Sequence, residues 1–500
     1  SATITNDGSL TIDTNAIATA TAGTQAYAYA YLDDGIYQYA SAEDGAASAS
    51  ITNGAGATID ISVAADANGG ADGTAYAYNY YHIYQEAVSA GADNAATVSL
   101  ANSGDISLTA KATATGGEYG YAYAYNYYPL YQYAYAYDGD ATATLANSAD
   151  ASIDISVVAD AKATEGYGYA YAYNYVPIEQ VAYAYGTDHD ALVELTNDGS
   201  IVAKADAKMA ASSYAYAYAS VEYGIYEYAY ASDGNANATL TNSADASIDI
   251  SALANATASS GNAYADARVY YGISQLAYAY GTGHDAADSL TNDGGISVGA
   301  EAHAVGTTGA GANATVYHPI AQYAYAGNGA ASVELKNNSG ATIDISATAT
   351  AKGDSATSAS TLSLVPAVAI GEDSGEANAT ITGAIYQAAF ANGEDIRPQD
   401  LSTLSVTTAI ASGADAVAAI TNAGTITIAA KASATGLTSA EATAQVINGF
   451  YQQATGNVAV DQLTNSGKID VTADAFASAA KADASALIEP AVHQLVNGAT

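Results

Sequence analysis

Residues 167–185 read YGYAYAYNYVPIEQVAYAY, a stretch in which large and small residues alternate almost without interruption. Alternation with a period of two is typical of a β-strand, because successive side chains of a strand point to opposite faces. A later copy, residues 264–273, carries Asp266 and Arg268 in the Tyr row. Charged side chains are almost never fully buried unless they are paired. We therefore predict that the Tyr row faces outward and that the Ala row forms the core.

The composition limits both the core and the partners of this chain. Half of its 500 residues are apolar, but with 44 Tyr, 3 Phe, 1 Met and no Trp the core must be thin and spread along a repeat. Eleven Lys and Arg against 51 Asp and Glu give a formal net charge of -40, which argues against nucleic acid as a partner. The chain has no Cys, so disulfides and Cys-ligated metals are excluded. No apolar run reaches the roughly 18 residues of a membrane span.

A short turn motif recurs along the chain, as in Leu195-Thr-Asn-Asp-Gly199. Its Asn residues follow one another at steps of 47, 49, 45, 50, 45, 50 and 45 residues, so the chain is one long repeat. A second recurring segment, such as Pro177-Ile-Glu-Gln180, contains Pro or Gly and predicts a corner. The Asn row comprises Asn6, Asn53, Asn102, Asn147, Asn197, Asn242, Asn292 and Asn337. The Gln row comprises Gln38, Gln85, Gln132, Gln180, Gln275 and Gln322.

Each unit contains three segments of strand length: one after the Asn turn, such as 153–163, then the Tyr strand, then a third such as 181–185. Three strands and three corners are typical of one coil of a β-solenoid (β-helix), whose coils pair in parallel. We predict an all-β parallel β-solenoid of about 11 coils, with a thin Ala-rich core and outward Tyr ladders. At ~4.8 Å per coil it would form a rod of roughly 50 Å. The Asn and Gln rows are expected to form amide ladders between coils.

The repeat changes character along the chain. Regular coils extend over residues 1–380, and their Tyr rows end near residue 325. Residues 381–419 are predicted to form an irregular coil, because an insertion at 390–399 interrupts the pattern. Residues 420–500 resume the rhythm, so we predict C-terminal solenoid coils without the Tyr face.

Neither end of the sequence resembles a cap. Soluble solenoids normally cover the unpaired strand edges of their terminal coils, whereas the turn motif stands at 4–8 and again at 495–498. One interpretation is head-to-tail stacking of copies, which gives a filament because such contacts do not close. The other interpretation is that the sequence is a piece of a longer repeat protein.

The outward Tyr rows are the first candidate site. Stacked in neighbouring coils, they would form an aromatic surface larger than the few hundred Å² usual on a monomer. Lateral packing of copies and stacking on sugar rings are two uses of such a surface, and a soluble strand former without a partner is a third interpretation. The candidate residues are Tyr121, Tyr123, Tyr125, Tyr133, Tyr135, Tyr169, Tyr171, Tyr173, Tyr183, Tyr185, Tyr216, Tyr218, Tyr228, Tyr230, Tyr278 and Tyr280.

Recurring acidic corners are the second candidate site. Carboxylates in stacked turns suit Ca²⁺, which is the one cofactor that the sequence suggests. No stretch has the spacing of an EF-hand or of a glycine-rich nonapeptide, so solvated turn acids are the other interpretation. His189 and His284 occupy equivalent corners, and we expect turn and surface roles for them. The candidate ligands are Asp138, Asp140, Asp188, Asp190, Asp233 and Asp285.

The Leu-Thr-Asn-Ser/Asp-Gly turns, followed by Ala-alternating strands, resemble the β-strand repeats of bacterial secreted adhesins and autotransporter passenger regions. The likeness spans most of the chain and implies a secreted, extracellular bacterial β-solenoid at the cell surface, without catalytic residues. We expect a structural protein and no enzyme: a subunit of an extracellular filament or surface layer whose partners are copies of itself. The alternative is an adhesin that binds glycans or surfaces through the Tyr face.

Overall fold

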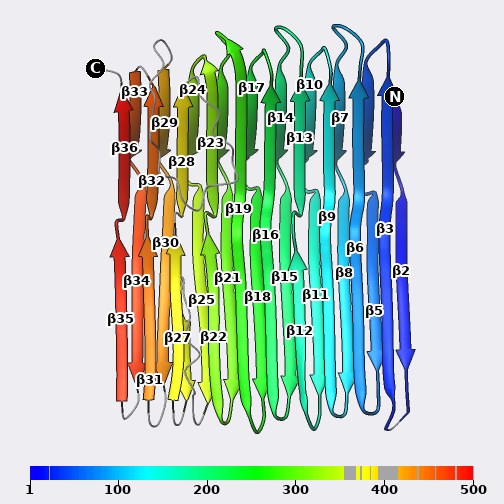
Figure 1. The fold of residues 1–500 in the computed structure, drawn as a ribbon, viewed down its shortest axis with the longest axis vertical. Helices are drawn as coiled ribbons and strands as arrows, with labels where there is room; N and C mark the ends of the chain where they lie inside the picture. The colour runs from blue at the N-terminus through cyan, green and yellow to red at the C-terminus, as the bar shows by residue number, and fades with distance from the viewer. Residues whose placement is uncertain are drawn as a thin grey trace.

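The computed structural model describes residues 1–21, 23–353, 367–371, 374–382, 384–391, 415–435, 439–456, 458–478 and 481–498. Within these residues every regular element is a β-strand, and the strands form three parallel sheets of 10, 11 and 15 strands (Figure 1). We name them sheet A, sheet B and sheet C. The predicted all-β parallel β-solenoid with three strands in a coil is confirmed.

Each complete coil passes through sheet A, then sheet B, then sheet C. Sheet A consists of β1 (Ala2–Asn6), β4 (Ala47–Asn53), β7 (Ala96–Asn102), β10 (Ala141–Asn147), β14 (Ala191–Asn197), β17 (Ala236–Asn242), β20 (Ala286–Asn292), β24 (Ala331–Asn337), β29 (Asp415–Asn422) and β33 (Val458–Asn465). Sheet B consists of β2 (Ser9–Thr19), β5 (Thr58–Asn68), β8 (Asp105–Gly116), β11 (Ser152–Ala163), β15 (Ser200–Ala211), β18 (Ser247–Ala258), β21 (Gly295–Gly306), β25 (Thr342–Gly353), β26 (Ala367–Gly371), β30 (Thr425–Thr435) and β34 (Lys468–Ser478). Sheet C consists of β3 (Gln25–Ala42), β6 (Asp72–Ser89), β9 (Tyr119–Ala136), β12 (Tyr167–Asn174), β13 (Ile178–Ala184), β16 (Tyr214–Ala231), β19 (Asn262–Thr282), β22 (Gly309–Tyr317), β23 (Ile320–Asn328), β27 (Ser374–Thr382), β28 (Ile385–Ala391), β31 (Ser439–Ile447), β32 (Phe450–Gly456), β35 (Lys481–Glu489) and β36 (Val492–Gly498).

The third strand of the coil is not the segment after the Pro or Gly corner, such as 181–185, that the sequence predicts. In β9 a single strand of 18 residues runs through the predicted corner, and a break appears there only in some coils, as between β12 and β13. Ala124 and Ala134 of β9 are both buried, so the inward row keeps its phase on the two sides of the corner and both halves join one sheet. The short segment that ends at the turn Asn provides the remaining strand, in sheet A.

These long strands also set the shape. A strand of 18 residues extends roughly 60 Å at ~3.3 Å per residue, which exceeds the height of ten coils at ~4.8 Å each. The longest axis therefore runs along the strands (Figure 1). Strands of sheet A occupy the upper half of this view and strands of sheet B the lower half, against the long strands of sheet C. The predicted rod is instead a slab of two layers.

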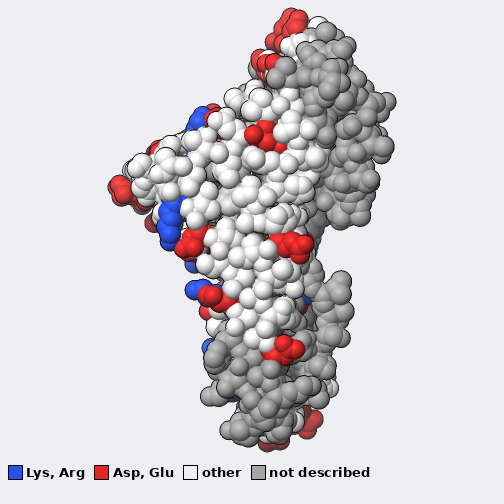
Figure 2. Space-filling view, turned by 90° about the vertical axis from the view of Figure 1, so that its left-hand side faces the viewer, with Lys and Arg blue, Asp and Glu red and all other residues white. Residues whose placement is uncertain are grey.

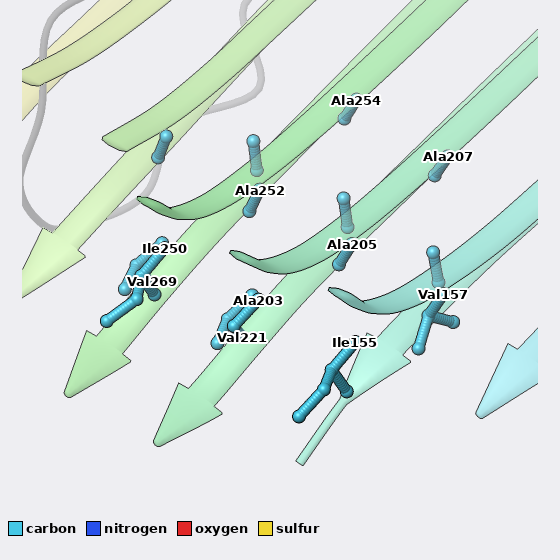
Figure 3. Close-up of a cluster of buried hydrophobic side chains, with 14 of the residues drawn as sticks. Ile155, Val157, Ala203, Ala205, Ala207, Val221, Ile250, Ala252, Ala254 and Val269 are labelled. Atoms are coloured by element: carbon cyan, nitrogen blue, oxygen red, sulfur yellow. The ribbon is translucent and has the colours of Figure 1, made fainter. Parts of the chain in front are cut away.

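The core between the layers is thin, as the composition requires. Ile153, Ile155 and Val157 of β11 face it and give way to Ala159 and Ala161, all of them at most 1% exposed. Figure 3 shows Ile155 and Val157 among the buried side chains of this core. A second cluster between sheet A and the upper half of sheet C is made almost entirely of Ala and Val. Small side chains let the two layers approach closely, and the prediction that the Ala row is buried is confirmed.

Amide ladders hold the coils in register. Asn Nδ2 donates to the Asn Oδ1 of the next coil at 2.8 Å in every step from Asn6 to Asn465. Strands pair residue for residue although the repeat lengths differ, so the extra residues lie in turns. For example, β8 starts three residues after Asn102 whereas β11 starts five residues after Asn147. Both predicted ladders are present, and the Gln ladder continues to Gln494.

The stack continues through the C-terminal residues. Strands β29 to β36 extend all three sheets, as predicted for residues 420–500. Residues 392–414, which hold most of the predicted insertion, lie outside the described residues. On the side of the last coils, the described surface carries isolated acidic groups and few basic ones (Figure 2).

Candidate functional site: the tyrosine face of sheet C

The outward row of sheet C forms what we call the tyrosine face, the Tyr side chains of β3 to β23. Parallel register places equal residues above one another, as for Tyr123, Tyr171 and Tyr218. Neighbouring coils are only ~4.8 Å apart, so the rings must tilt or shift to fit. Fourteen of the 16 Tyr that the sequence singles out are half-buried, and the remaining two are Tyr218 and Tyr278.

Contacts between rings explain this half-burial. The ring centroids of Tyr78 and Tyr123 lie 5.2 Å apart, and those of Tyr127 and Tyr175 lie 4.9 Å apart at an interplanar angle of 3°. Each ring thus covers part of its neighbour and is held in place by it. Burial also raises the pKa of the Tyr119 phenol group, to about 12. The result is a preformed aromatic surface with few free rotations.

Two of the predicted surface residues are buried. Tyr278 is 2% exposed, because it packs between Tyr228 at 5.6 Å and Tyr323 at 5.4 Å in a cluster of buried side chains. Tyr218 is 8% exposed, because the Arg268 guanidinium lies 5.3 Å from its ring centroid. The prediction that Tyr218 and Tyr278 belong to an exposed interaction surface is therefore wrong. By contrast, all five Tyr of β3 are exposed, at 47–62% for Tyr27, Tyr29, Tyr31, Tyr37 and Tyr39.

One column of aromatic rings extends past the point where the Tyr rows end. Consecutive ring centroids in this column are 4.7–6.3 Å apart. Sequence reasoning missed the column, although Tyr386, Tyr451 and His493 each stand immediately before a ladder Gln. Its members are Tyr37, Tyr84, Tyr81, Tyr128, Tyr175, Tyr223, Tyr271, His318, Tyr386, Tyr451 and His493.

An acidic residue interrupts the tyrosine face in its middle. Glu179 of β13 takes the outward position between Tyr131 and Tyr226 in register. Burial among the rings raises the pKa of Glu179 to about 8. Burial therefore favours the neutral carboxylic acid form of Glu179 over the carboxylate.

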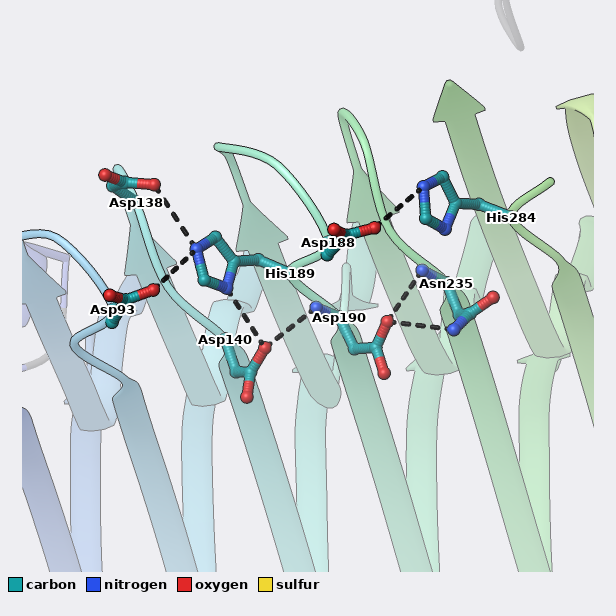
Figure 4. Close-up of polar contacts among 8 residues, drawn as sticks. All are labelled: Asp93, Asp138, Asp140, Asp188, His189, Asp190, Asn235 and His284. Carbon is teal, nitrogen blue, oxygen red and sulfur yellow. Dashed lines mark hydrogen bonds and ion pairs between the residues drawn. The ribbon is translucent and has the colours of Figure 1, made fainter. Parts of the chain in front are cut away.

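The acidic corners are organised around the two His residues (Figure 4). His189 Nε2 lies 3.3 Å from Asp138 Oδ1 and 3.8 Å from Asp93 Oδ1, and His189 Nδ1 lies 3.7 Å from Asp140 Oδ1. His284 repeats the arrangement one coil pair later, with Nε2 at 3.1 Å from Asp233. These contacts are ion pairs when the imidazole is protonated.

The same corners contain a third ladder that the sequence did not reveal. Backbone N–H groups donate to a side-chain oxygen of the preceding coil, from Asp190 to Asp140 at 2.9 Å and from Asn235 to Asp190 at 2.8 Å. The series continues from Asp285 to Asn235 at 2.9 Å and from Ala330 to Asp285 at 2.7 Å. The carboxylates of Asp140, Asp190 and Asp285 and the amide oxygen of Asn235 thus accept hydrogen bonds from the turn of the next coil.

The six candidate calcium ligands all lie in the corners between sheet C and sheet A. Asp188 lies 3.7 Å from His284 Nε2. Together with the contacts given above, each of the six candidate acids therefore has a His side chain or a backbone N–H group beside it. Among the described residues no group of three or more His, Asp or Glu side chains is placed to hold a metal ion. Calcium binding stays a prediction from the sequence.

Compared with protein-family models, with curated proteins and with solved structures, the chain matches none. Within the part of the chain that the structure describes, no helix is long and apolar enough to cross a membrane. The fold and its outer surface define the class to which the chain belongs: a parallel β-solenoid repeat protein whose long sheet carries a tyrosine face.

Proposed function

We propose that this protein is a structural subunit of an extracellular filament or surface layer, and that copies associate laterally through the tyrosine face. The observation that supports it is the series of outward Tyr in consecutive coils, held in register by parallel pairing. Tyr provides a broad contact area and keeps a polar tip for hydrogen bonds. Rings already fixed by their neighbours lose little further entropy when they become covered.

A second copy is the partner that fits this surface best. Its own tyrosine face presents rings at the same spacing of ~4.8 Å between coils, so the two sets of rings can interdigitate. The formal net charge of -40 opposes association of copies at low ionic strength. Salt screens this repulsion, so we expect lateral assembly to strengthen as ionic strength rises.

Head-to-tail stacking is the second part of the proposal. Inside the chain each coil joins the next through parallel strand pairing and the two amide ladders. The same contacts would join coils of two copies wherever two coil edges are free, and contacts of this kind continue without closing. The location outside a bacterial cell rests on the likeness of the turn motifs to those of secreted adhesins.

The test is to substitute three residues of successive coils whose rings contact one another, Tyr123→Thr, Tyr171→Thr and Tyr216→Thr, in one protein. Thr is a good strand former, so the three coils should fold while the aromatic surface in the middle of the tyrosine face is reduced. We expect wild-type protein to form lateral assemblies in sedimentation velocity and electron microscopy as concentration and salt increase, and the variant to form at most single filaments.

The matched control substitutes the outer face of sheet B, with Thr109→Ala and Ser156→Ala, which should leave assembly unchanged. Equal assembly of wild type and the Tyr variant would overturn the lateral contact. A wild-type protein that stays monomeric under all conditions would overturn self-assembly, and binding to glycans through the tyrosine face would then be measured.

A further inference from the structure

The Gln ladder contains one rung that is not an amide. Strand pairing places Glu227 of β16 between Gln180 of β13 and Gln275 of β19. Its side chain is 0% exposed, like those of the two Gln neighbours. The buried polar atoms of a carboxyl group in this position need hydrogen-bond partners, as do those of the amides in the coils before and after it.

All amide rungs share one direction of hydrogen bonding. In each step the Nε2 group donates to the Oε1 atom of the preceding coil, at 3.0 Å from Gln132 to Gln85 and at 2.9 Å from Gln180 to Gln132. Further along, Gln275 donates to Glu227 Oε2 at 2.7 Å and Gln322 donates to Gln275 at 2.8 Å. The carboxyl group therefore accepts from the coil after it, as an amide oxygen would.

The step before Glu227 lacks its hydrogen bond. Gln180 Oε1 and Glu227 Oε1 are both buried without a hydrogen-bond partner. The donors of Gln180 are already used, because Nε2 bonds to Gln132 Oε1 and to the Glu194 backbone oxygen at 3.2 Å. Two acceptors thus occupy adjacent rungs, and one proton between them would satisfy both.

We propose that Glu227 is protonated in the folded protein and donates a hydrogen bond to Gln180 Oε1, so that the ladder is complete only while this proton is bound. A neutral carboxylic acid has one O–H donor and one C=O acceptor, which supply the donor and the acceptor that a Gln rung directs to its two neighbouring rungs. The second hydrogen bond of the Gln rungs, from Nε2 to a backbone oxygen, has no counterpart in the acid. Ionisation removes the donor and places a charge in the core, so the middle coils weaken as the pH rises.

The surroundings favour the neutral form. Burial is the main reason that the pKa of Glu227 is raised to about 8, the bond from Gln275 lowers it in part, and the charge of Glu194 raises it further. Asp288 of β20 is also buried, and burial raises its pKa well above the ordinary value, with Glu227 as an additional cause. Strands β13, β14, β17 and β20 carry no Lys or Arg that would stabilise the carboxylate, and the one Arg of β19, Arg268, is hydrogen-bonded to Asp266.

The sign of the pH dependence follows from these values. The unfolded chain releases this proton near pH 4.5, and the folded chain holds it until about pH 8. The contribution to stability is fully present below pH 4.5 and is lost as pH rises to about 8. Between these values one proton leaves on unfolding, so the unfolding equilibrium constant should rise about tenfold per pH unit from this group alone.

The experiment combines a direct readout of protonation with two substitutions. In protein labelled with ¹³C at the Glu carboxyl carbons, we expect a resonance that titrates near pH 8 and is absent from Glu227→Gln. The variant Glu227→Gln should lose about one proton from the pH dependence of unfolding between pH 5 and 8. A Glu227 resonance that titrates below pH 5, or parallel stability profiles of the two proteins, would overturn the proposal.

Two further variants separate the hydrogen bond from mere burial. Glu227→Met keeps the size but removes the donor and acceptor, so it should unfold more easily at pH 5 than both wild type and Glu227→Gln. Gln132→Glu moves an acid to an equivalent rung, and it should create a new Glu resonance with a raised midpoint. Glu227→Met as stable as Glu227→Gln, or Gln132→Glu titrating like an exposed Glu, would contradict a ladder bond.

Discussion

The two faces of one strand in sheet C place opposite demands on side chains. Ala172 faces inward, is 0% exposed, and pairs in register with Ala124 and Ala219. Its neighbour Tyr171 faces outward, in a row that holds Asp266 in a later coil. Inward residues meet a second layer at close distance, whereas outward side chains meet other rings of the same face. The comparison teaches that inward positions such as Ala172 accept only small side chains, whereas the outward positions accept side chains of different size and charge.

The largest expected effect comes from ionising the outward row. Burial raises the pKa of Tyr119, Tyr135 and Tyr214 from 10.0 to about 12. Unfolded phenols ionise first, so this contribution to stability is fully present below pH 10 and is lost as pH rises to about 12. We expect cooperative alkaline unfolding, measured as a joint change in phenolate absorbance and circular dichroism. Gradual titration near pH 10 with the fold intact would contradict it.

Overfilling the inward row should have the next largest effect. Ala172→Leu adds carbon atoms where Ala124 and Ala219 leave no room, and we expect the free energy of unfolding to fall by about 3 kcal/mol. The matched control is Tyr171→Leu on the outward side of the same strand, which should change stability by less than about 1 kcal/mol. Denaturant titration measures both, and equal losses would show that the two faces do not differ in packing.

Removing one amide rung should cost somewhat less. Asn197 donates to Asn242 at 2.8 Å and to the Ser247 backbone oxygen at 3.0 Å, and it accepts from Asn147. Asn197→Ala leaves these buried groups without partners, so we expect a loss of about 2 kcal/mol. The adjacent exposed residue is the control, since Asp198→Ala should change stability by about 0.5 kcal/mol or less. A neutral Asn197→Ala would mean that the ladder adds nothing to coil stacking.

The smallest effect on stability is expected for a single outward ring. Tyr171→Thr removes ring contacts with Tyr123 at 6.0 Å and with Tyr216 at 5.6 Å, but Thr keeps the strand. We expect the free energy of unfolding to fall by about 1 kcal/mol or less in the same denaturant titration. A loss as large as that of Ala172→Leu would indicate that the rings form a second core instead of a surface.

Sequence reasoning predicted most of the fold because each rule was repeated in many coils. Period-two alternation identified the strands, and charged residues such as Asp266 identified the outward row. The recurrence of Asn at steps of 45 to 50 residues predicted the ladder that the structure confirms. The predicted corner at Pro177 was harder, because Pro or Gly in a strand can bend the chain or merely break its pairing.

The candidate site was predicted less completely. The outward direction of the Tyr rows is confirmed, but the burial of Tyr278 depends on the residues packed around it. The donors of the corner ladder through Asp140 are backbone N–H groups, which every residue except Pro has. The sequence therefore contains no residue type that would predict this ladder. Strand pairing places Glu227 between two Gln rungs, and its burial is visible only in the structure.

By itself the sequence determined the coil, its parallel stacking, the buried Ala row and the two amide ladders, because all of them follow from alternation and from the recurrence of the same motifs in every coil. Only the tertiary structure decided that both halves of the Tyr segment share one long sheet, which outward rings are covered, and which acids are buried. These features depend on contacts between residues that lie a whole coil apart, and a local pattern does not contain the packing of its neighbours.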